Sequence, residues 1–583
     1  MSDHHIAAEY DRIVRQDIEQ FRADAEAFQA GKLTDDQFRA VRLRRGVYGQ
    51  RQPNVHMIRT KVPSGIVTSA QMRQLAAISD EFAGGKAHLT TRQNVQYHFV
   101  PLPQVADLLH KLADVRMTTR EACYNTVRNV TCCPVAGIVR DEVFDVRPHA
   151  RRLAFAFLHK DLTDSMPRKF KIAFSACKDD CIGTSINDLG FRAVIRDGER
   201  GFRVTVAGGL GPLPCESRVL VEFLPEDRVV NIAEAVIRIF NQYGNRANKN
   251  KARLKFVLRE RGFDWLKEHV EKEYADILTN GGIPMPDEVP EGFGGFQEHP
   301  LPPATGELLP VVDNRLADPE FDAWLEWNVE EQKQAGYSIV TVRVDQGNFN
   351  SEQMRGLADI SDRAADGLLR FSMTQNLIIG SVAVASLPRV YAALKMLGLA
   401  QSGANTIEDN VNCPGAYSCN LALTKSMNLG DALSEVVHGE TDPQVRKLSI
   451  HVSGCPNSCG QHWTGDFGFY GNARKIEGRE VPYYQMLLGG GPDEDGILRF
   501  GWAIHSLPAR MVPTALLRVV EHFKANRQDG EKFREYVQRH KVEFFRGLLM
   551  DLAKPTQFSP EMYLDWGDDV AYSLQLGRGE CAS

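Results

Sequence analysis

The chain has 583 residues, of which 43% are hydrophobic and 25% are charged, and this ordinary globular composition excludes a disordered, collagenous or fibrous protein. Lys and Arg number 69 against 75 Asp and Glu, so the net charge is −6 and no overall basic field points to nucleic acid. Eleven cysteines are too few for a disulfide scaffold, and no apolar segment predicts a secretory signal or a membrane span. We therefore expect a cytoplasmic protein of several domains, in which clustered cysteines serve metal or redox chemistry.

The first 54 residues predict an N-terminal arm of one or two amphipathic helices, because Ile13, Ile18 and Phe21 recur at helical spacing. Strands are expected around 57–62 and 93–100, with a helix over 69–82 between them. Residues 281–306 are dense in Pro and Gly and have no hydrophobic period. They predict a linker or an extended crossing segment.

The sequence beyond this linker repeats the sequence before it. Residues 68–96 align without a gap on residues 350–378, and nearly half of the positions are identical. A later stretch also repeats, so that Cys177 and Cys181 correspond to Cys455 and Cys459. Two long repeats are too few for a solenoid. They predict two α+β halves with mixed sheets, related by a pseudo-two-fold axis, with a ligand bound between them.

Two cysteine pairs in the second half predict a metal centre. Cys413 and Cys419 form a C-x5-C pair, and Cys455 and Cys459 form a C-x3-C pair. The surrounding Pro, Gly, Asn and Ser build tight loops whose N–H groups can point at sulfur. Pro456 suits the first turn of a helix, so Cys455 and Cys459 are expected to share one helical face. Four thiolates fit an iron–sulfur cluster or zinc, and the spacing favours iron and sulfur. Four unrelated buried cysteines are the third interpretation.

Further motifs accompany the cysteines in a fixed order. They are Ile58-Arg59-Thr60-Lys61-Val62-Pro63, Thr90-Thr91-Arg92-Gln93-Asn94, Arg128-Asn129-Val130 and Met166-Pro167-Arg168-Lys169-Phe170-Lys171. Together with the cysteine pattern they resemble the sulfite and nitrite reductases that contain siroheme and a 4Fe-4S cluster, in particular the haemoprotein component of the assimilatory enzymes. The resemblance covers roughly residues 48–550.

This resemblance implies a role for each matching residue. Cys413, Cys419, Cys455 and Cys459 would hold the 4Fe-4S cluster, and Cys459 would also bridge to the siroheme iron. Arg59, Arg128, Lys169 and Lys171 would face a small oxyanion substrate. Arg92, Gln93 and Asn94 would bind the siroheme carboxylates.

The resemblance also implies a domain plan, in which each half has a ferredoxin-like half-domain and a mixed α/β sheet domain, with the cofactors at the interface. The expected bounds are 1–54 for the helical arm, 55–125 and 126–280 for the first half, 281–334 for the linker, and 335–403 and 404–583 for the second half.

Other cysteines leave alternatives open. Cys177 and Cys181 predict either a remnant of the duplication or a second cluster, and the remnant is favoured because the counterpart of Cys419 near position 138 is Ile138. The family also suggests a covalent link between Tyr48 and Cys123.

The most detailed predictions concern the identity of the substrate and of the electron donor. Lys171 resembles the sulfite reductases, where plant-type nitrite reductases have Asn, so sulfite is favoured over nitrite. No nicotinamide- or flavin-binding segment is found, which implies an external donor, either ferredoxin or a separate flavoprotein. The basic stretch 42–51 is a candidate docking surface for an acidic ferredoxin, and the alternative is that it supports the loop on the haem side. Two other classes stay open: a non-catalytic zinc-binding protein, and a siroheme-type protein that works in dissimilation or as a sensor.

Overall fold

The computed structural model describes residues 3–294, 301, 319–575, 577 and 580. Part of the predicted linker, at 295–300 and 302–318, lies outside the described residues. The predicted arm contains α1 (Asp3–Gln29) and α2 (Asp35–Arg44), as expected. The expected helix is α3 (Ser69–Phe82), where a capping box between Thr68 and Gln71 fixes the first turn.

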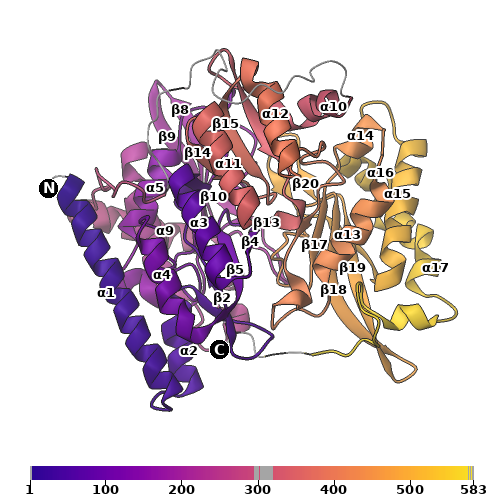
Figure 1. Cartoon of the computed structure of the whole chain (residues 1–583), viewed down its shortest axis with the longest axis horizontal. Helices are drawn as coiled ribbons and strands as arrows, with labels where there is room; N and C mark the ends of the chain where they lie inside the picture. The colour runs from indigo at the N-terminus through magenta and orange to yellow at the C-terminus, as the bar shows by residue number, and fades with distance from the viewer. Residues whose placement is uncertain (1–2, 295–300, 302–318, 576, 578–579, 581–583) are drawn as a thin grey trace.

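Two small sheets exchange a strand with each other (Figure 1). The first has the order β1 (Val47–Gly49), β2 (Val55–Arg59), β5 (Val95–Pro101), β4 (Lys86–Leu89) and β13 (Asn348–Asn350). The second has the order β11 (Val329–Glu331), β12 (Tyr337–Val342), β15 (Leu377–Ala383), β14 (Leu368–Phe371) and β3 (Ile66–Thr68). Because β13 and β3 each join the sheet of the other half, the two halves are held together by main-chain hydrogen bonds.

Two larger mixed sheets share one topology. They are β6 (Thr131–Cys132), β7 (Ile172–Ser175), β8 (Leu189–Arg196), β9 (Glu199–Val206) and β10 (Arg218–Pro225), and β16 (Val411–Asn412), β17 (Ile450–Ser453), β18 (Phe467–Ile476), β19 (Arg479–Leu488) and β22 (Trp502–Pro508). In each sheet the first three strands are parallel and the rest antiparallel. A ribbon of β20 (Gly491–Pro492) and β21 (Leu498–Arg499) follows β19.

Helices pack on these sheets in corresponding places. In the first half they are α4 (Val105–Ala113), α5 (Arg147–Ala156), α6 (Asp161–Asp164), α7 (Val229–Tyr243), α8 (Leu254–Arg261) and α9 (Phe263–Thr279). The others are α10 (Pro319–Asn328), α11 (Ser351–Ala364), α12 (Leu387–Met396), α13 (Ser426–Val437), α14 (Pro443–Arg446), α15 (Val512–Asn526), α16 (Phe533–Leu548) and α17 (Met550–Ala553). None of the described helices is long and apolar enough to cross a membrane.

Reciprocal contacts confirm the predicted pseudo-two-fold axis. Helices α3 and α11 pack on each other, and Arg73 pairs with Asp362 at 2.6 Å while Arg355 pairs with Asp80. The side-chain amide of Gln93 donates to Phe371 O at 2.8 Å, and that of Gln375 donates to Leu89 O at 2.8 Å. The predicted fold class, two related α+β halves with ferredoxin-like and mixed sheets, is therefore confirmed.

Candidate active site

One large cavity lies where the two halves meet. The first half contributes the end of β2, the turn between β4 and β5, and the segments around 122–129 and 168–171. The second half contributes the loops that follow β16 and β17. About 1540 Å³ of space, part of it open to solvent, lies between them. Residues of both halves line this space, so it is a candidate binding site between them.

This cavity is lined by Cys413, Cys419, Cys455 and Cys459 of the second half. The pKa of the Cys413 and Cys419 thiols is raised, to about 12 for Cys419, first by burial and then by the nearby Cys459 thiol. The pKa of Cys455 is raised for the same two reasons. Thiolates that are destabilised by burial and by their neighbours are suited to a cationic metal centre, which removes this repulsion.

The main chain around the sulfurs is built for close approach. The Gly454 N–H donates to Cys413 Sγ at 3.2 Å, as the loop composition predicts. A Cβ at Gly460 would lie 2.1 Å from Val452 O, so the residue after Cys459 has no space for a side chain. The predicted helix at Cys455 and Cys459 is wrong, because residues 454–465 form turns. Ser458 and Gln461 have φ of 60° and 57°, which a right-handed helix does not allow.

The spacing of these sulfurs is wider than a single ion requires. Four thiolates on one tetrahedral zinc ion, at about 2.3 Å each, would lie about 3.8 Å apart. Among the described residues, three or more Cys, His, Asp or Glu ligand atoms lie within 4.8 Å of one another only at a group in the first half. No three of the four cavity sulfurs come that close together. Thiolates bound to separate corners of an iron–sulfur cube lie farther apart, so the cavity fits a cluster better than zinc.

Six cations face the same cavity. They are Arg59, Arg92, Arg128, Arg168, Lys169 and Lys171, and the lining residues include no Asp or Glu. The Arg59 guanidinium lies 2.7–2.8 Å from the side-chain amide of Gln96, with the amide oxygen turned toward it. Arg128 donates from Nε to Tyr124 O at 3.0 Å. A cavity with this charge attracts anions.

Two of these cations lie in a crowded environment. The pKa of Lys171 is well below its usual value because of burial and then because of Arg92, Arg253 and Lys169. The pKa of Arg92 is lowered to about 9, mainly by burial. Arg92 donates from Nη1 to Asn187 Oδ1 at 2.7 Å, which fixes its position beside the cavity. A bound anion would reduce the repulsion between these positive charges and so stabilise their charged forms.

The remaining predicted cofactor residues differ in placement. Asn94 lines the cavity, and its side chain accepts from Thr90 Oγ1 at 2.6 Å. Gln93 is not among the lining residues. Its amide donates to Cys132 O and Phe371 O, each at 2.8 Å, and accepts from Cys132 N at 2.9 Å. The structure therefore gives Gln93 contacts with the main chain of both halves.

Sequence reasoning missed several lining residues. Arg168 lies inside a motif that was used, but only its neighbours were selected. His88 and His98 line the cavity, whereas the spacing of the histidines gave no reason to choose them. Burial lowers the pKa of His88 to about 4 and that of His98 to about 3. Both imidazoles are therefore neutral at physiological pH.

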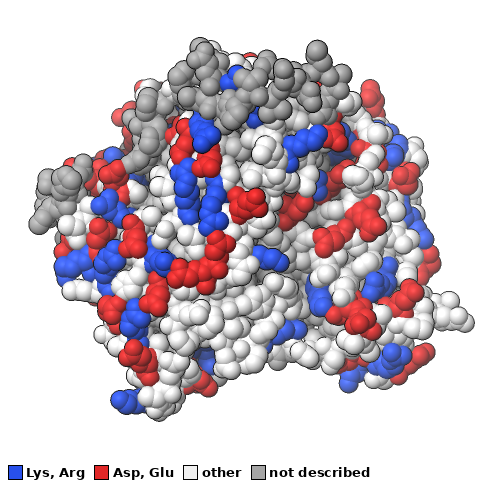
Figure 2. All heavy atoms as spheres, in the orientation of Figure 1, with Lys and Arg blue, Asp and Glu red and all other residues white. Residues whose placement is uncertain are grey.

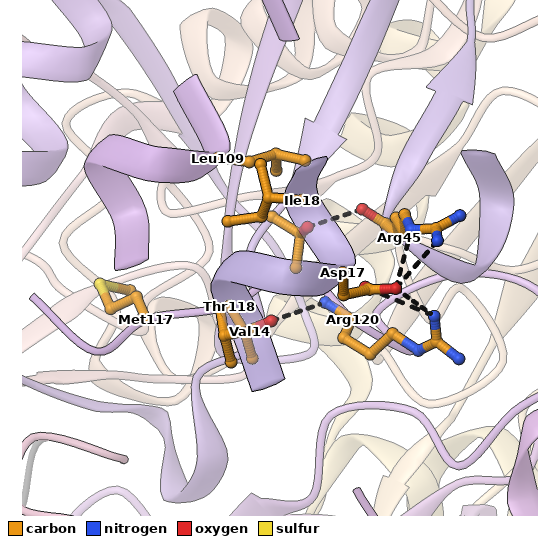
Figure 3. Close-up of a pocket in the computed structure, with 9 residues that line it drawn as sticks. Val14, Asp17, Ile18, Arg45, Leu109, Met117, Thr118 and Arg120 are labelled. Atoms are coloured by element: carbon orange, nitrogen blue, oxygen red, sulfur yellow. Dashed lines mark hydrogen bonds and ion pairs between the residues drawn. The ribbon is translucent and has the colours of Figure 1, made fainter. Parts of the chain in front are cut away.

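The basic stretch 42–51 does not form the exposed patch that a docking surface needs. Figure 3 shows Asp17 of α1 beside Arg45 and Arg120. The distance from Arg45 Nη2 to Asp17 Oδ1 is 2.9 Å. Arg42 pairs with Glu580, and both side chains are about nine-tenths buried. Because acidic partners neutralise these arginines, the stretch anchors α1 and the chain end instead. On the face shown in Figure 2, basic and acidic residues are interspersed.

The fold brings four thiols and six cations together in one cavity, as a protein with a thiolate-bound metal centre and an anion site requires. The chain belongs to the nitrite and sulfite reductase family. The family's "Nitrite and sulphite reductase 4Fe-4S domain" matches residues 123–278 and 403–555. Its "Nitrite/Sulfite reductase ferredoxin-like half domain" matches 48–120 and 330–397. The expected domain bounds stay a prediction.

Curated relatives include both activities. The chain is 30% identical over 516 residues to an assimilatory ferredoxin-dependent nitrite reductase of Haloferax mediterranei, covering 85% of this chain and 84% of the relative. It is 28% identical over 497 residues to a ferredoxin sulfite reductase of Mycobacterium tuberculosis, covering 84% and 83%. The solved structure of the Mycobacterium tuberculosis NirA protein has a TM-score of 0.73 and 26% identity, covering 88% of this chain and 92% of that one.

Membership of this family implies siroheme and a 4Fe-4S cluster as the cofactors. The residues present fit both groups. Four lining cysteines supply the thiolates that a cluster needs. The arginines, lysines and amides that line the same cavity suit the carboxylates of siroheme.

Proposed function

We propose that the chain reduces sulfite to sulfide by six electrons taken from an external ferredoxin. The observation that carries this proposal is the composition of the cavity, which combines four thiols from one half with six cations and no carboxylate. Cys413, Cys419, Cys455 and Cys459 would hold the cluster, with Cys459 shared between the cluster and siroheme. When bound, these cofactors supply electrons one at a time at a single iron.

The residues of the chain would bind and protonate the substrate. Arg59 is held by the side-chain amide of Gln96, and Arg128 donates to main-chain carbonyl oxygens. Because these contacts restrict both guanidinium groups, they present rigid donors to the oxygen atoms of an oxyanion. Lys169 and Lys171 carry movable ammonium groups. The lowered pKa of Lys171 makes its proton easier to transfer, as removal of oxygen as water requires. Arg92 and Asn94 would bind siroheme carboxylates. Gln93, which lies behind the lining residues, would hold the main chain that carries Arg92 and Asn94 in place.

Sulfite is favoured by the excess of positive charge, because a dianion gains more than a monoanion from six cations. Nitrite is the second candidate, and the 30% identity to a nitrite reductase supports it. The test is a steady-state assay of the holoenzyme with reduced methyl viologen and each anion. A kcat/KM for nitrite well above that for sulfite would refute the choice of sulfite, while activity with neither would refute the function.

The donor needs a separate test. Relatives named as ferredoxin-dependent support ferredoxin, and a flavoprotein is the alternative. Turnover with reduced ferredoxin should fall as salt rises if docking is electrostatic. Turnover supported by a flavoprotein reductase alone would reverse this choice of donor.

A further inference from the structure

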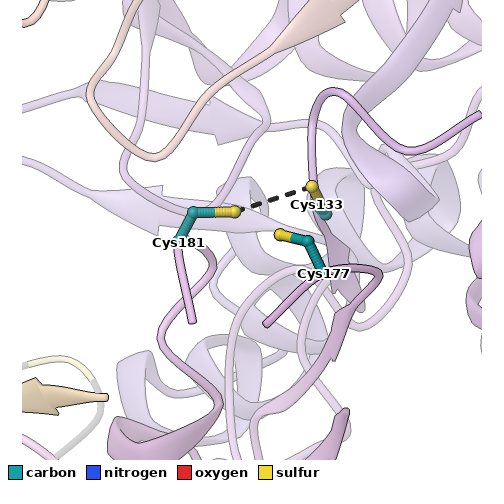
Figure 4. Close-up of side chains that lie close together, drawn as sticks. All are labelled: Cys133, Cys177 and Cys181. Atoms are coloured by element: carbon teal, nitrogen blue, oxygen red, sulfur yellow. Dashed lines mark hydrogen bonds between the residues drawn. The ribbon is translucent and has the colours of Figure 1, made fainter. Parts of the chain in front are cut away.

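A second group of cysteines lies outside the cavity, in the first half. Figure 4 shows Cys133, Cys177 and Cys181 with their sulfurs pointing toward one another. All three Sγ atoms lie within 4.8 Å of one another, and Cys181 Sγ lies 3.5 Å from Cys133 Sγ. Cys133 follows β6, and the other two lie in the loop after β7. None of the three lines the active-site cavity.

This group occupies the place that corresponds to the proposed cluster ligands. Strand β6 pairs with β7 as β16 pairs with β17, with Cys132 opposite Phe174 and Asn412 opposite Val452. The Cys133 N–H donates to Phe174 O at 2.9 Å, and the Cys413 N–H donates to Val452 O at 3.2 Å. Cys133 is therefore the counterpart of Cys413.

The geometry differs from the second half in a way that changes the chemistry. No sulfur is present at the position that corresponds to Cys419, where the sequence has Ile138 and Val139. The three sulfurs are also closer together than separate corners of an iron–sulfur cube require. Three thiolates on one tetrahedral ion, at about 2.3 Å each, lie about 3.8 Å apart, which this group can reach with small movements.

The three thiols form a compact group that is open on one side. Cys181 donates to Cys133 Sγ, and Cys177 donates to Asp179 O at 3.2 Å. Cys133 and Cys177 are buried and Cys181 is exposed, so one side of the group is open to solvent. A metal ion would thus have three protein ligands and one position for water, since none of the other described Cys, His, Asp or Glu joins the group.

We propose that Cys133, Cys177 and Cys181 bind a single divalent ion that prefers thiolates, of the Zn²⁺ class. The site is separate from the proposed catalytic centre and does not depend on it. The loop that carries Cys177 and Cys181 also contacts the second half. Asp180 N–H donates to Gly496 O at 2.9 Å, and Ser185 Oγ donates to Leu498 O at 3.1 Å. A bound ion would fix this loop and so support a contact between the halves.

The test measures metal content in the full-length holoenzyme, purified and dialysed without chelator. The wild type should contain about one zinc per chain in addition to its iron. Cys181→Ser should reduce zinc at least tenfold and leave iron, labile sulfide and the visible spectrum unchanged. Cys215→Ser, outside the group, is the matched control and should keep the zinc. Zinc K-edge absorption should show sulfur neighbours at about 2.3 Å.

Other outcomes overturn the proposal. Zinc at equal levels in the wild type and in Cys181→Ser would place the ion elsewhere. A wild type that neither contains zinc nor takes up one equivalent of added Zn²⁺ would leave the group without a metal. Loss of iron and sulfide, with normal haem absorption, in Cys181→Ser would mean that the group holds a cluster. Cys177→Ser is a second variant, in case Cys181→Ser does not fold.

Discussion

Replacement of Lys171 by Gln tests the anion site most directly. The ammonium group lies in the cavity beside Arg92 and Lys169, and burial is the largest cause of its lowered pKa. A hydrogen bond from a charged donor contributes about 1.5–3 kcal/mol, and each 1.36 kcal/mol changes a rate tenfold. We therefore expect kcat/KM for the anion to fall roughly 10- to 150-fold. Five other cations remain, so binding is weakened rather than abolished.

The pH dependence gives a second readout. Lys171 carries its proton below its pKa, and that pKa lies below the usual lysine range. If the proton or the charge is used, kcat/KM of the wild type should decrease as pH rises through this lowered pKa. The decrease should disappear in Lys171→Gln, and Lys171→Arg should move it to higher pH, because an arginine stays protonated. Lys32→Gln, at an exposed position between α1 and α2, is the control and should keep the wild-type profile.

Stability should move in the opposite direction from activity. A lysine whose pKa is lowered by folding binds its proton more weakly in the native state than in the unfolded chain. The resulting penalty is complete below the native pKa and is relieved as pH rises toward the unfolded value, about 10.4. Lys171→Gln removes the penalty, so its Tm at pH 7 should rise. A lower Tm together with unchanged kcat/KM would show that Lys171 is a structural residue, and the reasoning would fail.

Three other perturbations have defined outcomes. Cys459→Ser should lower iron and labile sulfide and change the haem absorption, whereas Cys215→Ser should leave both unchanged; an unaltered spectrum would contradict the shared-ligand assignment. Lys61→Met should lower the free energy of unfolding by about 3–5 kcal/mol in urea titrations, because it leaves Glu121 buried without the ammonium at 2.9 Å. The double variant Lys61→Met with Glu121→Gln should recover much of that loss in unfolding free energy. An equal loss in the single and the double variant would argue against the ion pair. His98→Gln should change the level of activity but not the shape of its pH profile between pH 5 and 8, because the pKa of His98 is about 3 and the imidazole stays neutral throughout; a lost acidic limb would contradict this.

The repeat made most of the fold predictable. A gap-free alignment of 68–96 on 350–378 already implies paired helices, and α3 and α11 each begin at a capping box with Gln at the third position. The exchange of β3 and β13 could not be predicted, because three-residue edge strands carry no pattern that selects one sheet over another.

Site residues with a distinctive side-chain chemistry could be predicted from the sequence. Features that depend on main-chain conformation or strand register could not. Cysteines and cations could be selected by motif, and they line one cavity. The conformation around Cys455 could not, since Pro456 is compatible with a helix but the positive φ of Ser458 is not. His88 and His98 lie on neighbouring strands of one sheet, and only the register of β4 against β5 brings them to the cavity.

The exchanged strands explain how a duplicated chain can divide its chemistry. The register places Arg59 opposite Gln96 in β5, and its counterpart Thr341 opposite Ile378 in β15, so the second half keeps the strand but not the cation. Conversely, the first half keeps three cysteines but not the fourth. Because β13 completes the first sheet and β3 completes the second, neither half can keep its sheet intact when the other is removed. Each half is therefore free to lose the residues that the other supplies, and the cavity with both thiols and cations forms only in the joined chain.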